Sequence, residues 1–275
     1  MKNLNEESQH KPNESENKNV ELSILLPVRN DGLHLSIMLK MLKAVLDVPS
    51  EVIVIHDDPD DDSIPVVRET QQVFPQIRTV HNTLGRGVIN AIRAGVYDAN
   101  GEYILIFAAD ELGPLLAIED MLELMYQGCD FVSCTRYAHG GRRLGGSFIG
   151  KTLSTFANRL FTILSSTKLT DATTGIKMFR RSVFDSLNLE ANPVGWAVAF
   201  EMSIKAQLNN LKLGEVPIVS IDRLYGGEST FRPLPWIIEY MRWFLWGVKQ
   251  LPRKQAGKNN NVLVRIPKSC PFDKK

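Results

Sequence analysis

The first apolar run of the chain is Leu22-Ser-Ile-Leu-Leu-Pro-Val-Arg-Asn-Asp31, which ends abruptly in polar and acidic residues. Two later stretches repeat this pattern, Glu51-Val-Ile-Val-Ile-His-Asp-Asp58 and Tyr103-Ile-Leu-Ile-Phe-Ala-Ala-Asp-Glu111. Continuous apolar runs of this length are typical of parallel strands that are buried on both faces. Such strands deliver the residues that follow them to the carboxyl edge of the sheet, where ligands bind. The sequence therefore predicts a ligand site built from strand ends.

Segments with helical periodicity alternate with strand-like runs. Residues 33–46 carry apolar side chains at helical spacing between the first two runs, which predicts a β-α-β unit. The same criteria predict a helix over 63–74, a strand over 77–80, helices over 87–99 and 114–127, a strand over 130–134, a helix over 147–167 and a strand over 214–221. This order predicts an α/β fold in which helices flank one sheet.

One core-forming domain is expected over residues 20–233. A chain of 275 residues with 44% hydrophobic content can bury one sizeable core. Residues 1–19 are rich in Asn, Glu, Lys and Ser, which predicts a disordered tail. The formal net charge of +1 gives no overall bias toward nucleic acid, and the three cysteines lack metal-type spacing. We expect a protein with reduced thiols that does not bind nucleic acid.

The C-terminal part of the chain predicts an amphipathic helix over 234–252. This stretch holds three of the four tryptophans, Trp236, Trp243 and Trp246, and charged residues interrupt it. It is short for a membrane-spanning helix and suits a helix that lies in a membrane interface. The alternative is a helix packed on the domain or in a homo-oligomer interface. Residues 253–275 form a basic tail that could assist binding to anionic lipid.

Acidic residues follow two of the strand-like runs directly. Asp58 ends the second run, where a carboxylate can accept hydrogen bonds from a base or a ribose, whereas residues 60–62 are interpreted as a solvated acidic loop. Asp110 and Glu111 end the third run and are candidates for holding Mg²⁺ or Mn²⁺ against a diphosphate, because hard cations prefer carboxylate and phosphate oxygens. Taken alone, an Asp-Glu pair before a proline is more often a helix cap.

Glycine and basic residues gather in two further places. Gly85-Arg-Gly87 precedes a predicted helix, so its backbone can approach an anion closely at the start of that helix. Arg136 and Lys151 flank a glycine-rich segment, and Arg223 and Arg232 flank a second one. Guanidinium groups bind phosphate oxygens bidentately, which predicts loops that close over phosphates. Ordinary surface charge is the alternative for some of these residues.

Together and in this order, the segments resemble family 2 glycosyltransferases of the GT-A fold, and within them the dolichyl- or polyprenyl-phosphate mannosyltransferases. The likeness runs from about residue 21 to about residue 233. Its matching segments are Pro27-Val-Arg-Asn-Asp31, His56-Asp-Asp58, Gly85-Arg-Gly87, Asp130-Phe-Val-Ser-Cys-Thr-Arg-Tyr137, Asp171-Ala-Thr-Thr-Gly-Ile-Lys-Met-Phe-Arg-Arg181 and Gly214-Glu-Val-Pro-Ile-Val-Ser-Ile-Asp-Arg-Leu-Tyr-Gly226. The resemblance implies a Rossmann-like mixed sheet, a nucleotide diphosphate sugar donor, a divalent cation and a lipid-phosphate acceptor.

The resemblance also implies residue roles. It places Pro27, Arg29 and Asp31 at the nucleoside, Asp58 near the base or ribose, and Gly85 and Gly87 at the start of a donor-side helix. The groups that it implies near the donor diphosphate or the acceptor phosphate are Arg136, Lys151, Ser154, Arg223, Ser229 and Arg232. Asp110 matches the last acidic residue of the family's D-x-D metal motif, Asp171 shapes the sugar and acceptor pocket, and Glu201 lies near the position of a base.

Two positions depart from the family pattern. Ala108 stands where the first Asp of D-x-D is usual, and Leu112 stands two residues after Asp110, so neither side chain can bind a cation. The expected function is an inverting transfer of a hexose, with GDP-mannose or a UDP-sugar as donor, to a polyprenyl or dolichyl phosphate on the cytoplasmic face of a membrane. The alternatives are an impaired relative that binds nucleotide sugar without turnover, and a transferase acting on a soluble glycan.

Overall fold

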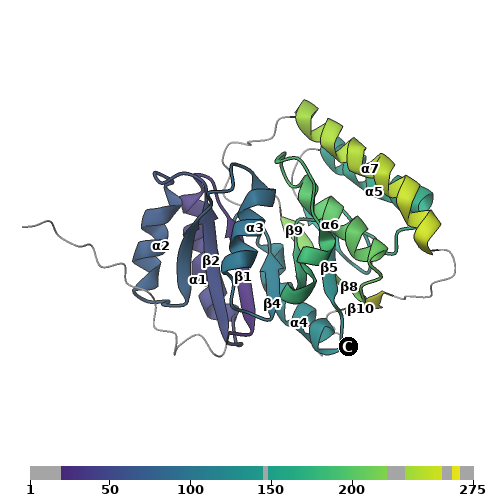
Figure 1. The fold of residues 1–275 in the computed structure, drawn as a ribbon. Coiled ribbons are helices and arrows are strands. Elements are labelled where there is room, and N and C mark those ends of the chain that lie inside the picture. Colours follow the sequence, from purple (N-terminus) through teal and green to yellow (C-terminus); the bar gives the residue numbers. More distant parts are fainter. Residues whose placement is uncertain (1–19, 145–147, 222–232, 256–261, 267–275) are drawn as a thin grey trace, which may run out of the picture.

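A central sheet of eight strands organises the protein. The computed structural model describes residues 20–144, 148–221, 233–255 and 262–266. The strands are arranged in the order β10-β8-β5-β7-β4-β1-β2-β3 (Figure 1). Their bounds are β1 Leu22–Pro27, β2 Ser50–His56, β3 Ile77–His81, β4 Tyr103–Ile106, β5 Phe131–Thr135, β7 Lys177–Arg180, β8 Leu213–Pro217 and β10 Leu263–Val264. All of their pairings are parallel except those of β7, which runs antiparallel to β4 and β5.

Two apolar cores cover the two faces of this sheet, because successive strand residues point to opposite faces. In β1, Ile24 and Leu26 belong to one core and Leu25 belongs to the other. The first core is closed by α1 (Gly32–Val45), α2 (Ser63–Gln71), the short 3-10 helix η1 (Gly113–Ala117) and α4 (Ile118–Tyr126). The second core is closed by α3 (Val88–Asp98) and α6 (Ala197–Leu208). The predicted mixed α/β fold is confirmed.

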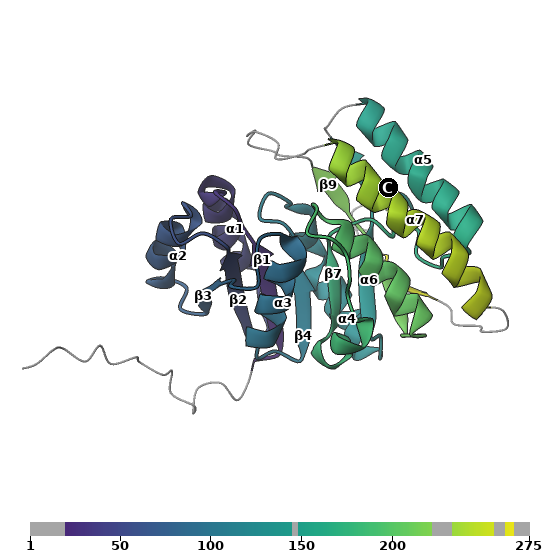
Figure 2. The same cartoon turned by 45° about the horizontal axis from the view of Figure 1, so that its top comes forward.

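Two long helices form an outer layer beyond α6. These are α5 (Phe148–Ser165) and α7 (Pro233–Gln255), which lie side by side in both orientations (Figures 1 and 2). Aromatic packing joins the layers, since the centroid of the Phe161 ring lies 4.8 Å from that of Phe200 in α6 and 5.4 Å from that of Phe244 in α7. The helix predicted over 234–252 is therefore packed on the domain along one side.

The observed elements differ from the predicted ones at several places, and the central strand β7 is among those that were not predicted. Helix α6 was not expected, because it is buried on all sides and so lacks amphipathic periodicity. The strand predicted over 214–221 is divided into β8 and β9 (Val219–Ile221), and β9 pairs with β6 (Arg142–Leu144) in a separate small sheet. Two short 3-10 helices, η2 (Arg181–Val183) and η3 (Asp185–Leu187), follow β7. Strand β10 lies inside the segment predicted to be a tail.

Candidate active site

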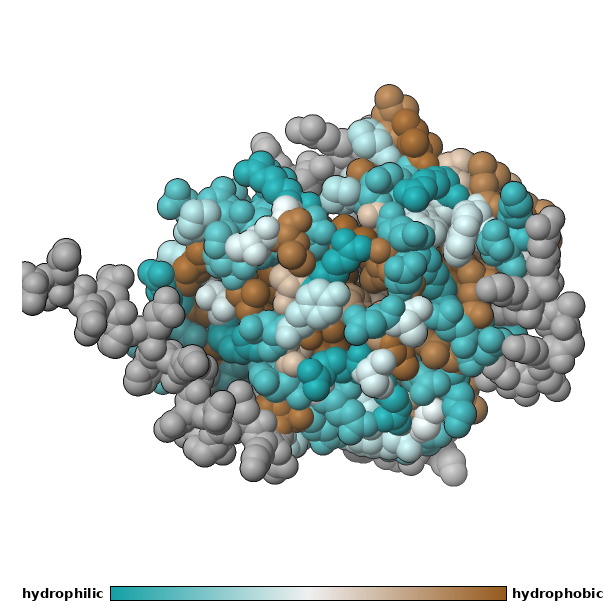
Figure 3. Space-filling model, viewed as in Figure 1, coloured by the Kyte–Doolittle hydropathy of each residue, from teal (hydrophilic) through white to brown (hydrophobic). Residues whose placement is uncertain are grey.

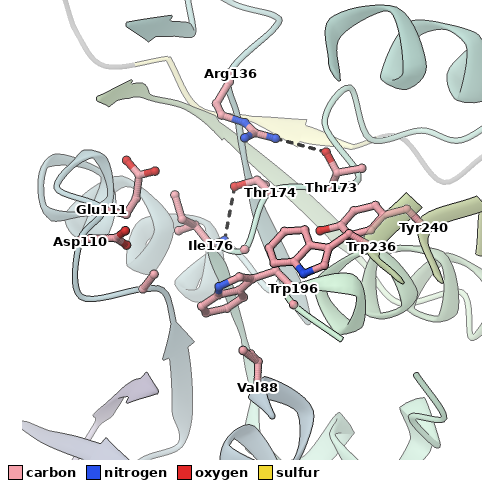
Figure 4. A pocket seen from close by; sticks show the side chains of 13 residues that line it. Val88, Asp110, Glu111, Arg136, Thr173, Thr174, Ile176, Trp196, Trp236 and Tyr240 are labelled. Atoms are coloured by element: carbon pink, nitrogen blue, oxygen red, sulfur yellow. Dashed lines mark hydrogen bonds between the residues drawn. The ribbon is translucent and has the colours of Figure 1, made fainter. Parts of the chain in front are cut away.

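A cavity of about 360 Å³ opens where the chain leaves the carboxyl ends of β4 and β5. Its walls come from segments far apart in the sequence, which the sheet topology brings together. They are formed by Val88, Ala108, Asp110, Glu111, Arg136, Thr173, Thr174, Gly175, Ile176, Gly195, Trp196, Trp236 and Tyr240. Figure 4 shows the acidic pair on one side, three aromatic residues on the other, and Arg136 at a third position. The predicted site at the strand ends thus includes a pocket with acidic, basic and aromatic walls.

The acidic side of the cavity is formed by Asp110 and Glu111, which follow β4. Glu111 is tied into the fold, because its carboxylate accepts hydrogen bonds from Ser220 Oγ at 3.0 Å and from the backbone N–H of Gly113 at 3.4 Å. Burial raises the pKa of Glu111 above its ordinary value, and these two hydrogen bonds oppose the rise. Glu111 is thus fastened to β9, whereas Asp110 lies beside it on the cavity wall (Figure 4).

These two carboxylates fit a divalent cation that keeps most of its water. Mg²⁺ is commonly held by one or two protein carboxylates together with substrate phosphates and water. Within the described residues, no group of three or more His, Cys, Asp or Glu side chains is placed to hold a metal ion. Ala108 lines the cavity without an oxygen, and Leu112 packs against the apolar core. Asp110 is therefore the first candidate ligand and Glu111 the second.

Arg136 is held in the cavity wall by Asp171. Its guanidinium donates from Nε to Asp171 Oδ2 at 2.7 Å and from Nη2 to Oδ1 at 3.0 Å, and Nη2 also reaches Thr173 Oγ1 at 3.2 Å. Asp171 is fully buried, and although burial opposes ionisation, the charge and hydrogen bonds of Arg136 hold the pKa of Asp171 below its ordinary value. The carboxylate of Asp171 therefore faces Arg136, and a role of Asp171 in shaping the pocket stays a prediction.

The loop that carries Asp171 is fixed from β8. Glu215 is buried there and accepts hydrogen bonds from the Thr170 backbone N–H at 2.8 Å, from Thr170 Oγ1 at 2.9 Å and from the Asp171 backbone N–H at 3.3 Å. Burial raises the pKa of Glu215 to about 7, against the effect of these donors. Asn158 of α5 adds a hydrogen bond from Nδ2 to Thr173 Oγ1 at 2.9 Å. The position of Arg136 is thus set by the loop of Asp171 and Thr173, which β8 and α5 hold in place.

Trp196, Trp236 and Tyr240 form the aromatic side of the cavity (Figure 4). Two glycines let the indoles approach the backbone: a Cβ at Gly175 would lie 2.8 Å from Trp196 Cε3, and a Cβ at Gly195 would lie 2.3 Å from Trp236 Cε2. Gly195 also has a φ of +53°, which favours glycine. These aromatic residues were not among the predicted site residues, although the spacing of Trp236 and Tyr240 placed both on one helix face.

The segment after β1 is held by an acidic loop. The backbone N–H of Asn30 donates to Asp61 Oδ2 at 2.9 Å, and that of Gly32 donates to Asp62 Oδ1 at 2.9 Å. The interpretation of residues 60–62 as a solvated loop is wrong for Asp61, whose exposed fraction is 2%. Asp31 lies 2.6 Å from His34 Nδ1, and burial raises the pKa of Asp31, with the nearby charge of Asp110 adding to the rise. Asp31 and Asp110 are therefore electrostatic neighbours.

Other predicted residues lie at the same edge of the sheet but outside the cavity wall. Pro27 ends β1, Arg29 follows it in an exposed turn, and Asp58 accepts a hydrogen bond from the Asp60 backbone N–H at 3.0 Å. Gly85 and Gly87 have φ values of +103° and +110° before α3. Such angles favour glycine, and α3 follows directly, whereas the binding of an anion at this turn stays a prediction.

The predicted phosphate-binding residues are divided between described and undescribed parts of the chain. Ser154 Oγ in α5 lies 2.8 Å from Tyr137 Oη, next to Arg136 in sequence. Arg223, Ser229 and Arg232 lie outside the described residues, and for Lys151 only the helical backbone is described. Of the predicted basic groups, Arg136 is the one that the described structure brings into the cavity.

Glu201 does not reach the cavity. It is fully buried in α6, where its carboxylate accepts the backbone N–H groups of Glu190 at 2.6 Å and Ala191 at 2.8 Å and pairs with Lys205 Nζ at 2.7 Å. Two of these partners belong to the segment before α6, and Lys205 lies one turn further along α6 itself, so none of them is part of the cavity wall. We therefore assign Glu201 no part in the chemistry, and the base position that the resemblance implied is structural in this chain.

The outer layer presents an apolar surface, which we call the α5–α7 face. Its exposed side chains are Phe156, Ile163 and Leu164 of α5 and Leu234, Ile237, Ile238, Met241 and Leu245 of α7. Figure 3 shows apolar side chains along the edge of the molecule where these helices lie. Trp243 is instead 2% exposed and points into the core, so aliphatic residues dominate this face. In the described residues, no helix has both the length and the apolar character needed to cross a membrane.

Sequence comparisons with known proteins identify relatives of this chain. The model of glycosyl transferase family 2 matches residues 23–187. A dolichol-phosphate mannosyltransferase of Pyrococcus furiosus is 25% identical over 232 residues, which cover 82% of this chain and 64% of that protein. One from Saccharomyces cerevisiae is 24% identical over 253 residues, covering 89% of this chain and 91% of that protein. The chain thus spans less than two thirds of the archaeal relative.

Solved structures share the fold. Glucosyl-3-phosphoglycerate synthase from Mycobacterium tuberculosis, in complex with Mn²⁺, UDP-glucose and phosphoglyceric acid, superposes with a TM-score of 0.62 and 16% identity. The alignment covers 84% of this chain and 80% of that one. At this identity the likeness concerns the GT-A fold alone, and it confirms the predicted fold class.

Proposed function

The chain belongs to glycosyl transferase family 2, and from this premise we propose that it transfers a hexose from a nucleotide diphosphate sugar to a polyprenyl or dolichyl phosphate. The observation that carries the proposal is the cavity, in which Asp110 and Glu111 lie across from Arg136 and from an aromatic wall that α7 helps to form. Phosphate, sugar and apolar groups each find a suitable surface within it.

The donor side of the proposed site is the acidic side. Asp110, with Glu111 beside it, would hold Mg²⁺ or Mn²⁺, and a bound cation would neutralise charge on the diphosphate leaving group. Arg136 presents a guanidinium to the same cavity and stabilises anionic oxygens there. The nucleoside would lie over Pro27, Asp31 and Asp58 at the neighbouring strand ends, as the family resemblance implies.

The proposed reaction is a single displacement with inversion. An oxygen of the acceptor phosphate forms a bond to the anomeric carbon while the bond from that carbon to the donor's β-phosphate oxygen breaks, and the nucleoside diphosphate leaves. The acceptor phosphate is already ionised at neutral pH, so the step needs no strong base. This agrees with the burial of Glu201, the residue in the family's base position. Orientation of the two substrates supplies much of the acceleration.

The acceptor side of the proposed site is α7. Trp236 and Tyr240 of this helix line the cavity, while Ile237, Ile238 and Met241 on its other side are exposed. One helix therefore joins the cavity to the α5–α7 face, and a lipid phosphate at a membrane surface could enter along it. We propose that this face lies in the membrane interface, on the cytoplasmic side, with the exposed Lys249 favouring anionic lipid.

Vesicle sedimentation tests this placement. Ile238→Glu adds a charge to the proposed membrane face and should reduce binding to vesicles that contain phosphatidylglycerol. Val73→Glu is the matched control, because Val73 is as exposed as Ile238 and follows the end of α2 by two residues. Helix α2 lies at the opposite end of the molecule from α7 (Figure 1). Equal sedimentation of the two variants and the wild type would exclude membrane contact through α7.

A transfer assay tests the reaction itself. Purified protein is incubated with Mn²⁺, radiolabelled GDP-mannose or UDP-glucose, and either polyprenyl phosphate or 3-phosphoglycerate. We expect label in the lipid fraction with one of the donors. Label on 3-phosphoglycerate would favour the soluble acceptor that the Mycobacterium enzyme uses, and binding of donor without any transfer would favour the impaired relative suggested by Ala108 and Leu112.

A further inference from the structure

Lys177 is a fully buried cation behind the cavity wall. It begins β7, directly after the cavity residue Ile176, and its exposed fraction is 0%. Its ammonium donates a hydrogen bond to Ser133 Oγ at 2.8 Å and lies 5.8 Å from the centroid of the Phe131 ring. A lysine in this position is costly, because an ammonium loses its hydration on burial. It calls for a compensating charge or a function.

The charged groups that act on Lys177 include Asp171 on the loop before β7, Arg136 directly after β5 and Glu215 on β8. The Cys134 thiol of β5 is a further titratable neighbour. Burial lowers the pKa of Lys177 to about 8, Asp171 is the strongest of the groups that oppose this fall, and Arg136 adds to it. Ser133 connects Lys177 to the Asp171 loop, since its hydroxyl accepts the hydrogen bond from Lys177 and lies 3.5 Å from the Asp171 carbonyl oxygen.

Arg136 alone is a weak anion site, because its guanidinium is already paired bidentately with Asp171. The pair has no net charge, and a phosphate would compete with a carboxylate for the same donors. When Lys177 is protonated, the group formed by Arg136, Asp171 and Lys177 carries a net charge of +1. A charge inside the protein acts over several ångströms with little screening.

We propose that Lys177 is a positioning residue whose buried positive charge offsets Asp171 and so lets Arg136 attract a diphosphate in the cavity. Lys177 touches no ligand and acts through the Arg136–Asp171 pair. The inference deepens the proposed function, on which it rests only in taking a diphosphate as the ligand. Removal of the charge should weaken diphosphate binding about tenfold, which corresponds to a loss of about 1.4 kcal/mol of binding free energy.

Calorimetry with UDP and GDP tests the proposal on the whole chain without an acceptor. Lys177→Met removes the charge and keeps the side-chain length, whereas Ser133→Ala removes the hydrogen bond and keeps the charge. We expect Lys177→Met to bind the better nucleotide about tenfold more weakly and Ser133→Ala to bind it nearly as the wild type does. A purely structural role would make the two variants alike, and that result would overturn the proposal.

The pH dependence of the same binding gives a second readout. Lys177 loses its proton as the pH rises through about 8, so wild-type affinity should fall between about pH 7 and about pH 9. The Lys177→Met affinity should stay constant over this range. A wild-type affinity that does not change overturns the inference alone, whereas absence of nucleotide binding at every pH overturns the proposed function with it.

Discussion

Replacement of Asp171 by Asn should destabilise the fold as well as the site. The substitution keeps the shape of the side chain but removes its charge and exchanges one acceptor oxygen for a donor. Asp171 is fully buried and accepts two charge-assisted hydrogen bonds from Arg136, at 2.7 and 3.0 Å. It also accepts the backbone N–H of Arg136 at 3.2 Å and that of Thr173 at 3.3 Å.

The size of the effect follows from these contacts. Removal of one partner from a buried ion pair costs about 3 to 5 kcal/mol, because the other charge is left buried. The Arg136 side chain is 15% exposed at the cavity, so water can partly solvate it, and we expect the lower end of this range, about 3 kcal/mol. At a typical urea m-value, this moves the unfolding midpoint down by about 1 M or more.

Urea unfolding followed by circular dichroism measures this shift. Asp60→Asn is the control, because Asp60 is exposed and its substitution should change the free energy of unfolding by less than about 0.5 kcal/mol. The pKa of folded Asp171 lies below its ordinary value of 3.8, so its contribution is complete above that pH and is lost as the pH falls through the folded pKa. An Asp171→Asn midpoint equal to that of the wild type near pH 7 would refute the argument.

Three further substitutions test other parts of the account. Asp110→Asn should leave the unfolding midpoint nearly unchanged and lower transfer turnover by about 100-fold, which a transfer assay at saturating donor would detect. Gly195→Ala should cost about 2 kcal/mol or more of unfolding free energy, since φ is +53° and the new Cβ meets Trp236. Gly140→Ala is the control, because Gly140 also has a positive φ, +93°, but no atom lies within 4 Å of the new Cβ. Its loss of stability therefore reports backbone strain without a steric clash. Glu201→Gln should lower stability by about 3 kcal/mol while turnover per folded molecule stays within about twofold, and a large loss of turnover at full folding would restore Glu201 to the chemistry.

The parts of the fold that could be predicted are those in which local sequence and tertiary environment agree. Strands β1, β2 and β4 are mostly apolar because both faces are buried, and this pattern is visible in the sequence. Helix α6 could not be predicted in the same way, since it is buried on every side and even includes Glu201 and Lys205. The antiparallel direction of β7 depends on pairing with distant strands, which no local pattern encodes.

The candidate site was predicted where charged residues follow strands and was missed where the wall is aromatic. Asp110, Glu111 and Arg136 follow β4 and β5 and do meet in the cavity. Trp196 gave no such signal, because its neighbour across the cavity wall is Gly175, a contact made only by folding. Asp61 was misjudged for a related reason: a run of aspartates indicates solvent, but one of them faces the Asn30 backbone N–H. Long-range partners decide these cases.

Calorimetric titration with GDP-mannose and UDP-glucose, with and without Mn²⁺, tests most directly the central claim that the cavity is a nucleotide-sugar site. The account predicts that one of the two donors binds, that Mn²⁺ strengthens its binding, and that Asp110→Ala removes the effect of Mn²⁺ while the protein stays folded. Absence of binding by either donor would contradict the account, as would binding that is equal in the variant and the wild type with Mn²⁺ present.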